Sequence, residues 1–234
     1  MSAPQGRLRG LTTKPGRKNA TGSELTRVPK IGILGGTFNP VHYAHLFIAQ
    51  SALEAFGLDK VFLVPNSIPP HKQVDSATPS ALSRYQMVKL AVAGNPTLEA
   101  LDLEINRGEV SYTVDTVKSL KALDPQTRLF YLAGLDSLLY YRWKGMEELL
   151  ENLTGFILVN RPGADFAAFE NWKQNCGLTG VNKFMPLNIP EVFLSATLIR
   201  ERLQKGLTVK YLLPEKVEEY IKQNLLYQNQ GVRK

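Results

Sequence analysis

The segment KIGILGGTFNPVHYAHL, at residues 30–46, carries the strongest indication of the fold of this chain. Its opening residues are mostly apolar and predict a buried strand, which ends at the adjacent glycines Gly35 and Gly36. A helical pattern begins a few residues later. Glycines let the backbone approach a ligand closely, and a helix start offers unpaired amides and a positive dipole end to anions. The segment therefore predicts a strand, a phosphate-binding loop and a helix in succession.

Short apolar runs alternate with helical patterns along the chain, which is typical of crossover units around a parallel sheet. We expect strands at residues 30–34, 61–64, 98–103, 128–132 and 155–159. Helices are expected at residues 43–56, 80–93, 111–123 and 146–153, followed by a small C-terminal helical part at 195–204 and 214–226. The predicted fold class is α/β, a Rossmann-like doubly wound parallel sheet with helices on both faces. Such sheets bind ligands at the carboxyl ends of their strands, where the winding reverses.

The net charge of +7 is concentrated at the N-terminus, because residues 1–30 hold seven basic residues and one acidic residue. The rest of the chain is close to neutral, so the charge gives no reason to expect a nucleic-acid partner. Residues 1–29 are rich in Gly, Ser, Thr and Pro and are predicted to be a disordered basic tail. A domain is expected at 30–228 and a flexible C-terminus at 229–234. An Arg-rich start also resembles an organelle transit peptide in composition, although it lacks a helical apolar face.

The cysteine content and hydropathy indicate the compartment. Cys176 is the only cysteine and cannot form a disulfide within the chain, which fits a reducing compartment. No stretch approaches the roughly 18 consecutive apolar residues of a membrane span. We therefore expect a cytoplasmic protein without a membrane partner, which could form a homo-oligomer.

Two histidines, His42 and His45, lie three residues apart at the start of the helix that follows the glycines. At this spacing both imidazoles can face one anion. Core or surface packing is the first alternative for such histidines. A zinc site is the second, but His71 is the only other histidine and the spacing of zinc-protease ligands is absent. The sequence predicts no metal ligands.

The two longest motifs resemble the signatures of the nucleotidyltransferase superfamily with paired histidines. GGTFNPVHYAHL, at 35–46, is similar to its glycine- and histidine-containing loop, and SATLIRERL, at 195–203, is similar to its second signature. Within the superfamily, residues 30–227 resemble the bacterial nicotinate-nucleotide adenylyltransferases. The matching segments are PPHK at 69–72, SYT at 111–113, GLDSL at 134–138, Trp143 and RPG at 161–163. Two positions depart from the family pattern: Asn39 stands where bacterial members usually have Asp, and Ala44 where they usually have Gly.

The resemblance implies transfer of AMP from ATP to nicotinic acid mononucleotide, giving deamido-NAD and pyrophosphate in NAD biosynthesis. Mg²⁺ is expected to arrive with ATP, since no carboxylate cluster in the sequence would form a dedicated cage. Three alternatives stay open. The acceptor could be nicotinamide mononucleotide or both mononucleotides, it could be phosphopantetheine, or the protein could be an inactive nucleotide-binding regulator.

The resemblance also assigns roles to individual residues. It implies catalytic roles for His42, His45 and Arg200. It assigns ATP binding to Gly35, Gly36, Thr37, Phe38, Gly134, Asp136, Arg161, Ser195 and Thr197. It assigns mononucleotide binding to Lys72, Tyr112, Thr113 and Trp143. Physical chemistry is compatible with these roles, because an indole can stack on a pyridine ring and a helix start can present amides to a carboxylate. Core packing for Trp143, helix capping for Asp136 and simple solvation for Lys72 and Arg200 are the alternatives.

Overall fold

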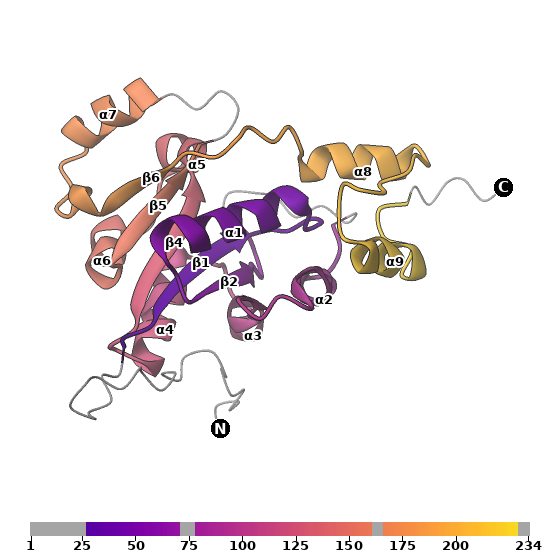
Figure 1. Cartoon of the computed structure of the whole chain (residues 1–234), viewed down its shortest axis with the longest axis horizontal. Helices are drawn as coiled ribbons and strands as arrows, with labels where there is room; N and C mark the ends of the chain where they lie inside the picture. The colour runs from indigo at the N-terminus through magenta and orange to yellow at the C-terminus, as the bar shows by residue number, and fades with distance from the viewer. Residues whose placement is uncertain (1–26, 71–77, 161–165, 229–234) are drawn as a thin grey trace, which may run out of the picture.

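The computed structural model describes residues 27–70, 78–160 and 166–228 and shows one parallel sheet flanked by helices (Figure 1). The sheet has six strands in the order β3-β2-β1-β4-β5-β6. Their bounds are Lys30–Gly36 for β1, Lys60–Pro65 for β2, Leu98–Ala100 for β3, Arg128–Gly134 for β4, Gly155–Val159 for β5 and Phe184–Leu187 for β6. The helices are α1 (Tyr43–Phe56), α2 (Ala81–Val92), α3 (Leu103–Arg107), α4 (Thr113–Leu123), α5 (Leu135–Tyr140), α6 (Met146–Asn152), α7 (Phe166–Asn175), α8 (Ala196–Gln204) and α9 (Glu215–Gln223), with the 3-10 helix η1 at Val181–Lys183.

The winding reverses between β1 and β4, which are neighbours in the sheet although β2 and β3 lie between them in the sequence. The two strands run parallel, with Leu34 opposite Leu132. Because the chain winds outward in opposite directions from this pair, the carboxyl ends of β1 and β4 mark the crevice in which doubly wound sheets bind their ligands. The segment at residues 37–42 follows β1 there, and α5 follows β4.

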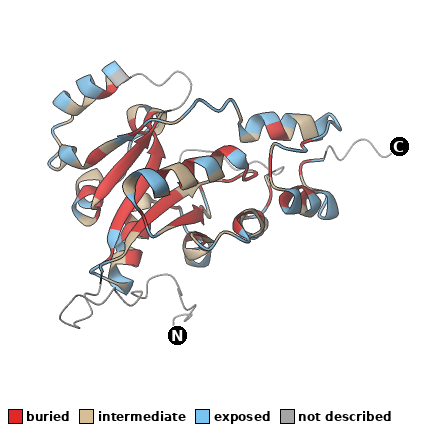
Figure 2. Cartoon of the chain, in the orientation of Figure 1, coloured by how far each residue is buried: buried red, intermediate tan, exposed pale blue. Residues whose placement is uncertain are grey.

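Apolar side chains cover both faces of the sheet, so its strands are buried (Figure 2). One core cluster lies between the sheet and helices α1, α2, α8 and α9, and the other lies between the sheet and α4, α5, α6 and α7. Neighbouring residues of β1 divide between the two clusters, with Ile33 in one and Leu34 in the other. A sheet covered on both faces explains why the strands are continuous apolar runs rather than alternating ones.

The predicted doubly wound α/β class is confirmed, and most predicted elements lie where expected. Helix α1 has the predicted bounds, and α2 and α8 begin after serine N-caps, Ser80 and Ser195. The strand predicted at 98–103 is wrong in its second half, because β3 ends at Ala100 and α3 begins at Leu103. The carbonyl of Asp102 already accepts the amide of Asn106 at 2.9 Å, so this part of the apolar run is helical.

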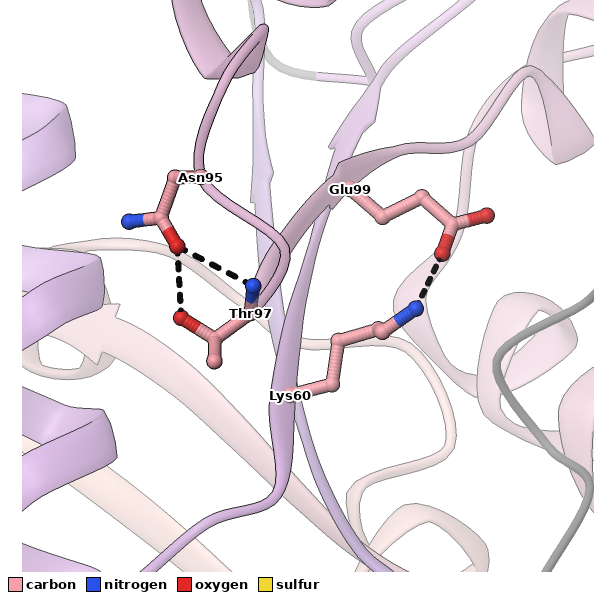
Figure 3. Close-up of polar contacts among 4 residues, drawn as sticks. All are labelled: Lys60, Asn95, Thr97 and Glu99. Carbon is pink, nitrogen blue, oxygen red and sulfur yellow. Dashed lines mark hydrogen bonds and ion pairs between the residues drawn. The ribbon is translucent and has the colours of Figure 1, made fainter. Parts of the chain in front are cut away.

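Polar contacts hold strand β3 at one edge of the sheet (Figure 3). The Lys60 ammonium group pairs with the Glu99 carboxylate at 2.6 Å and joins β2 to β3. Before the strand, the Asn95 side-chain oxygen accepts the Thr97 amide at 3.0 Å and the Thr97 hydroxyl group at 2.7 Å. These bonds fix the turn that enters β3.

The opposite edge strand, β6, is not among the predicted strands. It is four residues long and contains Pro186, which lacks the N–H that a central strand requires. An edge strand tolerates proline because one of its sides has no partner strand.

The residue before β1 is bonded to the sheet, because the Pro29 carbonyl accepts the amide of Arg128 at 2.9 Å. Residues 1–26 of the predicted tail and the C-terminus from 229 lie outside the described residues.

Candidate active site

The loop at residues 35–42, which we call the signature loop, leaves the carboxyl end of β1 at the crevice. A side chain at Gly35 would collide with the Tyr131 hydroxyl group of β4, so a larger residue there would require the buried Tyr131 side chain to move. Phe38 is buried and has a φ of 47°, a left-handed conformation that costs energy for a residue with a side chain. Its ring packs edge-on against His45, with centroids 5.0 Å apart.

The two histidines stand together at the start of α1. His42 occupies the N-cap position and is 5% exposed. Its backbone N–H donates to Nδ1 of His45 at 3.2 Å, and the two ring centroids are 3.8 Å apart. Because Nδ1 accepts a hydrogen bond, the neutral His45 ring carries its proton on Nε2. His45 therefore has a donor on the opposite side of its ring, as binding an anion requires.

Helix α8 brings the second signature to the first. Arg200 donates through Nη1 to the carbonyl oxygen of Asn39 at 2.8 Å and through Nη2 to the Thr197 hydroxyl group at 3.3 Å. Ser195 is the N-cap of α8, and its hydroxyl group accepts the Leu198 amide at 3.2 Å. Arg200 of α8 thus meets the signature loop, although 161 residues separate it from Asn39.

Asp136 lies in the first turn of α5, directly after the carboxyl end of β4. Gly134 is the N-cap residue of this helix and lies opposite Val159 of the neighbouring strand. Since β4 is the neighbour of β1, Asp136 follows a strand end on the opposite side of the crevice from the signature loop. Asp136 therefore lies at the carboxyl end of a strand beside the switch point, where doubly wound sheets bind their ligands.

The third group of predicted residues gathers around Tyr131. Trp143 and Phe156 both pack against the buried Tyr131 ring, at centroid distances of 5.8 and 5.5 Å. The Trp143 indole N–H donates to the Ser137 carbonyl at 3.0 Å, and the Thr113 hydroxyl group donates to Tyr131 Oη at 3.3 Å. Trp143 is partly exposed, so it combines core packing with a face that remains accessible. Burial raises the pKa of the Tyr131 hydroxyl group, which keeps it protonated.

Tyr112 and Thr113 lie at the start of α4. Tyr112 is the N-cap residue, and its side chain makes no capping hydrogen bond in the described structure. Its ring instead carries the Lys144 ammonium group 4.0 Å from the centroid. Below the helix start, the buried carboxylate of Glu104 accepts the Thr116 hydroxyl group at 2.6 Å, and burial raises the pKa of Glu104. The start of α4 therefore has a cation on the ring of its N-cap residue and a buried acid bonded to its first turn.

Two predicted binding residues, Lys72 and Arg161, lie outside the described residues, as does His71. The remaining predicted residues divide into the signature loop with α8, the end of β4, and the Tyr131 group. No cluster of three or more His, Cys, Asp or Glu side chains that could hold a metal ion occurs in the described parts of the chain. No helix there is long and apolar enough to cross a bilayer.

Sequence reasoning missed three residues that support the site: Arg84, Tyr131 and Tyr227. Arg84 lies on α2, four and eight residues before the buried Val88 and Val92, so it is a charged residue on the apolar face of its helix. That position is the one signal in the sequence that sets it apart. Tyr131 and Tyr227 resemble ordinary core aromatic residues, and only the structure shows where their hydroxyl groups lie.

The fold, the paired histidines and the arginine of α8 define a nucleotidyltransferase. The family model described as cytidylyltransferase-like matches residues 33–202. A probable nicotinate-nucleotide adenylyltransferase of Dictyoglomus turgidum is 42% identical over 199 residues, which cover 85% of this chain and 95% of the relative. The nicotinate-nucleotide adenylyltransferase of Bacillus subtilis is 40% identical over 204 residues, covering 86% and 99% of the two chains. The chain belongs to the bacterial nicotinate-nucleotide adenylyltransferases of this cytidylyltransferase-like family.

Its activity is accordingly that of a nicotinate-nucleotide adenylyltransferase, an enzyme of NAD biosynthesis. The fold also matches a solved structure, the Plasmodium falciparum nicotinic acid mononucleotide adenylyltransferase complexed with NaAD. The TM-score is 0.68 at 22% identity, over 85% of this chain and 97% of the other. The same parasite protein complexed with APC gives a TM-score of 0.66.

Proposed function

We propose that the enzyme transfers AMP from ATP to nicotinic acid mononucleotide. An oxygen of the mononucleotide phosphate forms a bond to the α-phosphorus of ATP, the bond from that phosphorus to the bridging oxygen breaks, and pyrophosphate leaves. The acceptor phosphate has a second pKa near 6, so it is largely dianionic at neutral pH and needs no general base. Catalysis then consists of aligning the reactants and stabilising charge on the phosphate oxygens.

The signature loop and α8 surround the triphosphate in this proposal. His42 and His45 contact the α-phosphate, supported by the amides of Gly36 and Thr37 and the Thr37 hydroxyl group. The start of α8, with Ser195, Thr197 and Arg200, holds the β- and γ-phosphates, because a helix start and a guanidinium group both favour anions. The observation that carries the proposal is the bond from Arg200 to the Asn39 carbonyl at 2.8 Å, which joins the two signatures.

The other residues bind the two ends of the reactants. Asp136 and Gly134 contact the adenosine ribose, and Phe38 and Gly35 shape the adjacent loop. Trp143 stacks on the pyridine ring, and the first amides of α4 at Tyr112 and Thr113 receive its carboxylate. We also assign Lys72 to the mononucleotide and Arg161 to ATP, on family resemblance alone. We infer that Mg²⁺ arrives with ATP, bound by phosphate oxygens and water. We further infer that the reaction takes place in the cytoplasm.

The proposal is tested by incubating the purified full chain with ATP and Mg²⁺ and with one acceptor at a time. The acceptors are nicotinic acid mononucleotide, nicotinamide mononucleotide and phosphopantetheine. We expect pyrophosphate release with the first, together with a product that has the mass of deamido-NAD. Release with only one of the other two would identify a different acceptor, and ATP binding without release would indicate an inactive regulator.

A further inference from the structure

Arg84 is a buried cation that joins the loops following β1 and β2. It is 1% exposed, and its Nη1 donates to the Thr37 carbonyl at 2.8 Å and to the Asn66 side-chain oxygen at 3.1 Å. Its Nη2 donates to the Ser67 carbonyl at 3.1 Å, and its Nε donates to the Pro79 carbonyl at 3.3 Å. All four acceptors are neutral, and no carboxylate pairs with Arg84 among the described residues. A buried cation is costly unless its donors are hydrogen-bonded. These bonds supply the partners that the buried guanidinium group needs.

The two loops that Arg84 joins are also bonded directly to each other. Asn66 donates from its side chain to the Thr37 hydroxyl group at 3.3 Å and from its backbone to the Gly36 carbonyl at 3.0 Å. The Ser67 amide donates to the Ser111 hydroxyl group at 2.9 Å, just before α4. The hydrogen bonds around Arg84 therefore extend from the signature loop to the start of the helix that we assign to the acceptor.

Tyr227 holds the same loop from the segment that follows α9, at the end of the molecule that also carries α8 (Figure 1). It is 8% exposed, and its hydroxyl group donates to the side-chain oxygen of Asn39 at 2.7 Å. Burial raises the pKa of this hydroxyl group, so it stays a donor at physiological pH. The side-chain oxygen of Asn39 accepts this hydrogen bond as the carboxylate oxygen of an aspartate would. Asparagine can therefore replace the aspartate that is usual at this position.

The two contacts lie on either side of the strained residue. Arg84 binds Thr37 and Tyr227 binds Asn39, and Phe38 between them has the φ of 47°. A left-handed conformation persists when the surrounding structure enforces it. Because the Phe38 ring packs on His45, a loop that relaxed at Phe38 would move the support of the histidine pair.

We propose that Arg84 and Tyr227 form a clamp that keeps the signature loop in the conformation required for adenylyl transfer. Both are positioning residues, because their contacts are to Thr37 and Asn39 and the loops beside them. The inference rests on the proposed role of the signature loop in binding phosphate. Neither residue belongs to the two signature motifs.

The sharpest test is Tyr227→Phe, which removes one hydroxyl group and keeps the ring. Losing one positioning hydrogen bond should lower kcat about 5- to 10-fold, with a smaller change in KM for either substrate. Both constants are measured well below the melting temperature of the variant. Tyr220→Phe is the matched control. Tyr220 lies on α9 and is partly buried, but its hydroxyl group makes no hydrogen bond within the described chain, so kcat should stay within about twofold.

A double-mutant cycle separates positioning from general stability. Asn39→Ala removes the acceptor, so Tyr227→Phe should have little further effect on kcat in that background. Independent effects that multiply in the double variant would contradict the clamp, as would a Tyr227→Phe variant with wild-type kcat. Failure of the proposed function would look different, because the wild-type enzyme itself would then release no pyrophosphate with nicotinic acid mononucleotide.

Arg84→Lys tests the other half of the clamp, since it keeps the charge and loses the planar set of donors. We expect kcat to fall on the order of 10²-fold, because several bonds to a charged donor are lost together. Met87→Ala, on the same helix and 0% exposed, controls for lost packing and should lower the melting temperature with kcat almost unchanged. If Arg84→Lys unfolds, the Tyr227 and Asn39 variants still decide the proposal. A folded Arg84→Lys variant with wild-type kcat would overturn it.

Discussion

The phosphate side and the acceptor side of the site are built by different means. On the phosphate side, Thr37 and Asn39 accept hydrogen bonds from Arg84 of α2, Arg200 of α8 and Tyr227 of the C-terminal segment. The His42 backbone N–H donates to Nδ1 of His45. On the acceptor side, Trp143 is held mainly by aromatic packing, and the start of α4 has no side-chain cap in the described structure. The hydrogen bonds on the phosphate side hold the backbone of the signature loop in one position. The acceptor side instead offers the surface of Trp143 and the first backbone amides of α4 to a ligand.

The two constructions suit two different tasks, adenylyl transfer on the phosphate side and choice of the acceptor on the other side. Charge stabilisation depends on donors that are placed before the substrate arrives, so the phosphate side should govern kcat. Stacking and amide contacts to the pyridine ring act on the bound ground state as well, so the acceptor side should govern KM and the choice of acceptor. Variants of His45, Trp143 and Ala44 test this division between kcat and KM.

The largest effect is expected for His45→Ala. Removing one positioned donor to the α-phosphate should lower kcat roughly 10²- to 10³-fold. His45 is partly exposed, so the melting temperature should change little. Steady-state pyrophosphate release and thermal unfolding measure the two quantities. Near-normal turnover would remove His45 from the mechanism.

A smaller and different effect is expected for Trp143→Ala. Aromatic stacking on a base is worth about 1–3 kcal/mol, so kcat/KM for the mononucleotide should fall roughly 5- to 100-fold, mostly through KM, while KM for ATP is retained. Trp172→Ala is the control, because Trp172 packs against the same core from α7. That control should lower stability without raising KM. Equal increases in KM for both substrates in Trp143→Ala would contradict the division.

The smallest effect is expected for Ala44→Gly, which restores the residue usual in the family. Ala44 is buried in the first turn of α1, where glycine has lower helix propensity. The free energy of unfolding should fall by about 1 kcal/mol, with kcat changed less than about twofold. Urea unfolding and the pyrophosphate assay measure these effects. A large change in kcat would show that the methyl group itself affects the triphosphate.

The fold and the motif residues could be predicted because their signals are local. Each strand is a run of apolar residues, and the helix starts at Ser80 and Ser195 carry ordinary N-cap residues. The exceptions have physical causes. Strand β6 pairs along one side with β5 and includes Pro186. The apolar run that begins with β3 continues into α3 after Asp102, so its second half is helical.

The supports of the site could not be predicted, because they depend on distant parts of the chain meeting in space. Tyr227 reaches Asn39 across 188 residues, and Arg84 reaches Thr37 across 47. In the sequence, Tyr227 resembles a core aromatic residue, and Arg84 stands out only by its position on the apolar face of its helix, which does not show what it binds. Only the packing of α2 and the C-terminal segment against the crevice gives these side chains their acceptors.

The start of α4 offers the most direct test of the division between the two sides. Thr113 is the first residue of the helix, where proline is well tolerated, and Tyr112 before it is extended, as a residue preceding proline should be. Thr113→Pro therefore removes one backbone N–H from the proposed carboxylate site with little disturbance of the helix. Thr113→Val is the control, because it loses the hydroxyl group and keeps that N–H.

The decisive measurement is the ratio of kcat/KM for nicotinic acid mononucleotide to that for nicotinamide mononucleotide, at fixed ATP and Mg²⁺. A site of amide donors suits a carboxylate and leaves the amide's NH₂ facing other donors, so the wild-type ratio should be at least about 10². Thr113→Pro should reduce it to about 10 or less, while Thr113→Val retains it. His45→Ala should lower both kcat/KM values by the same factor and leave the ratio unchanged. A wild-type ratio near one, or a ratio altered by His45→Ala and untouched by Thr113→Pro, would contradict the account.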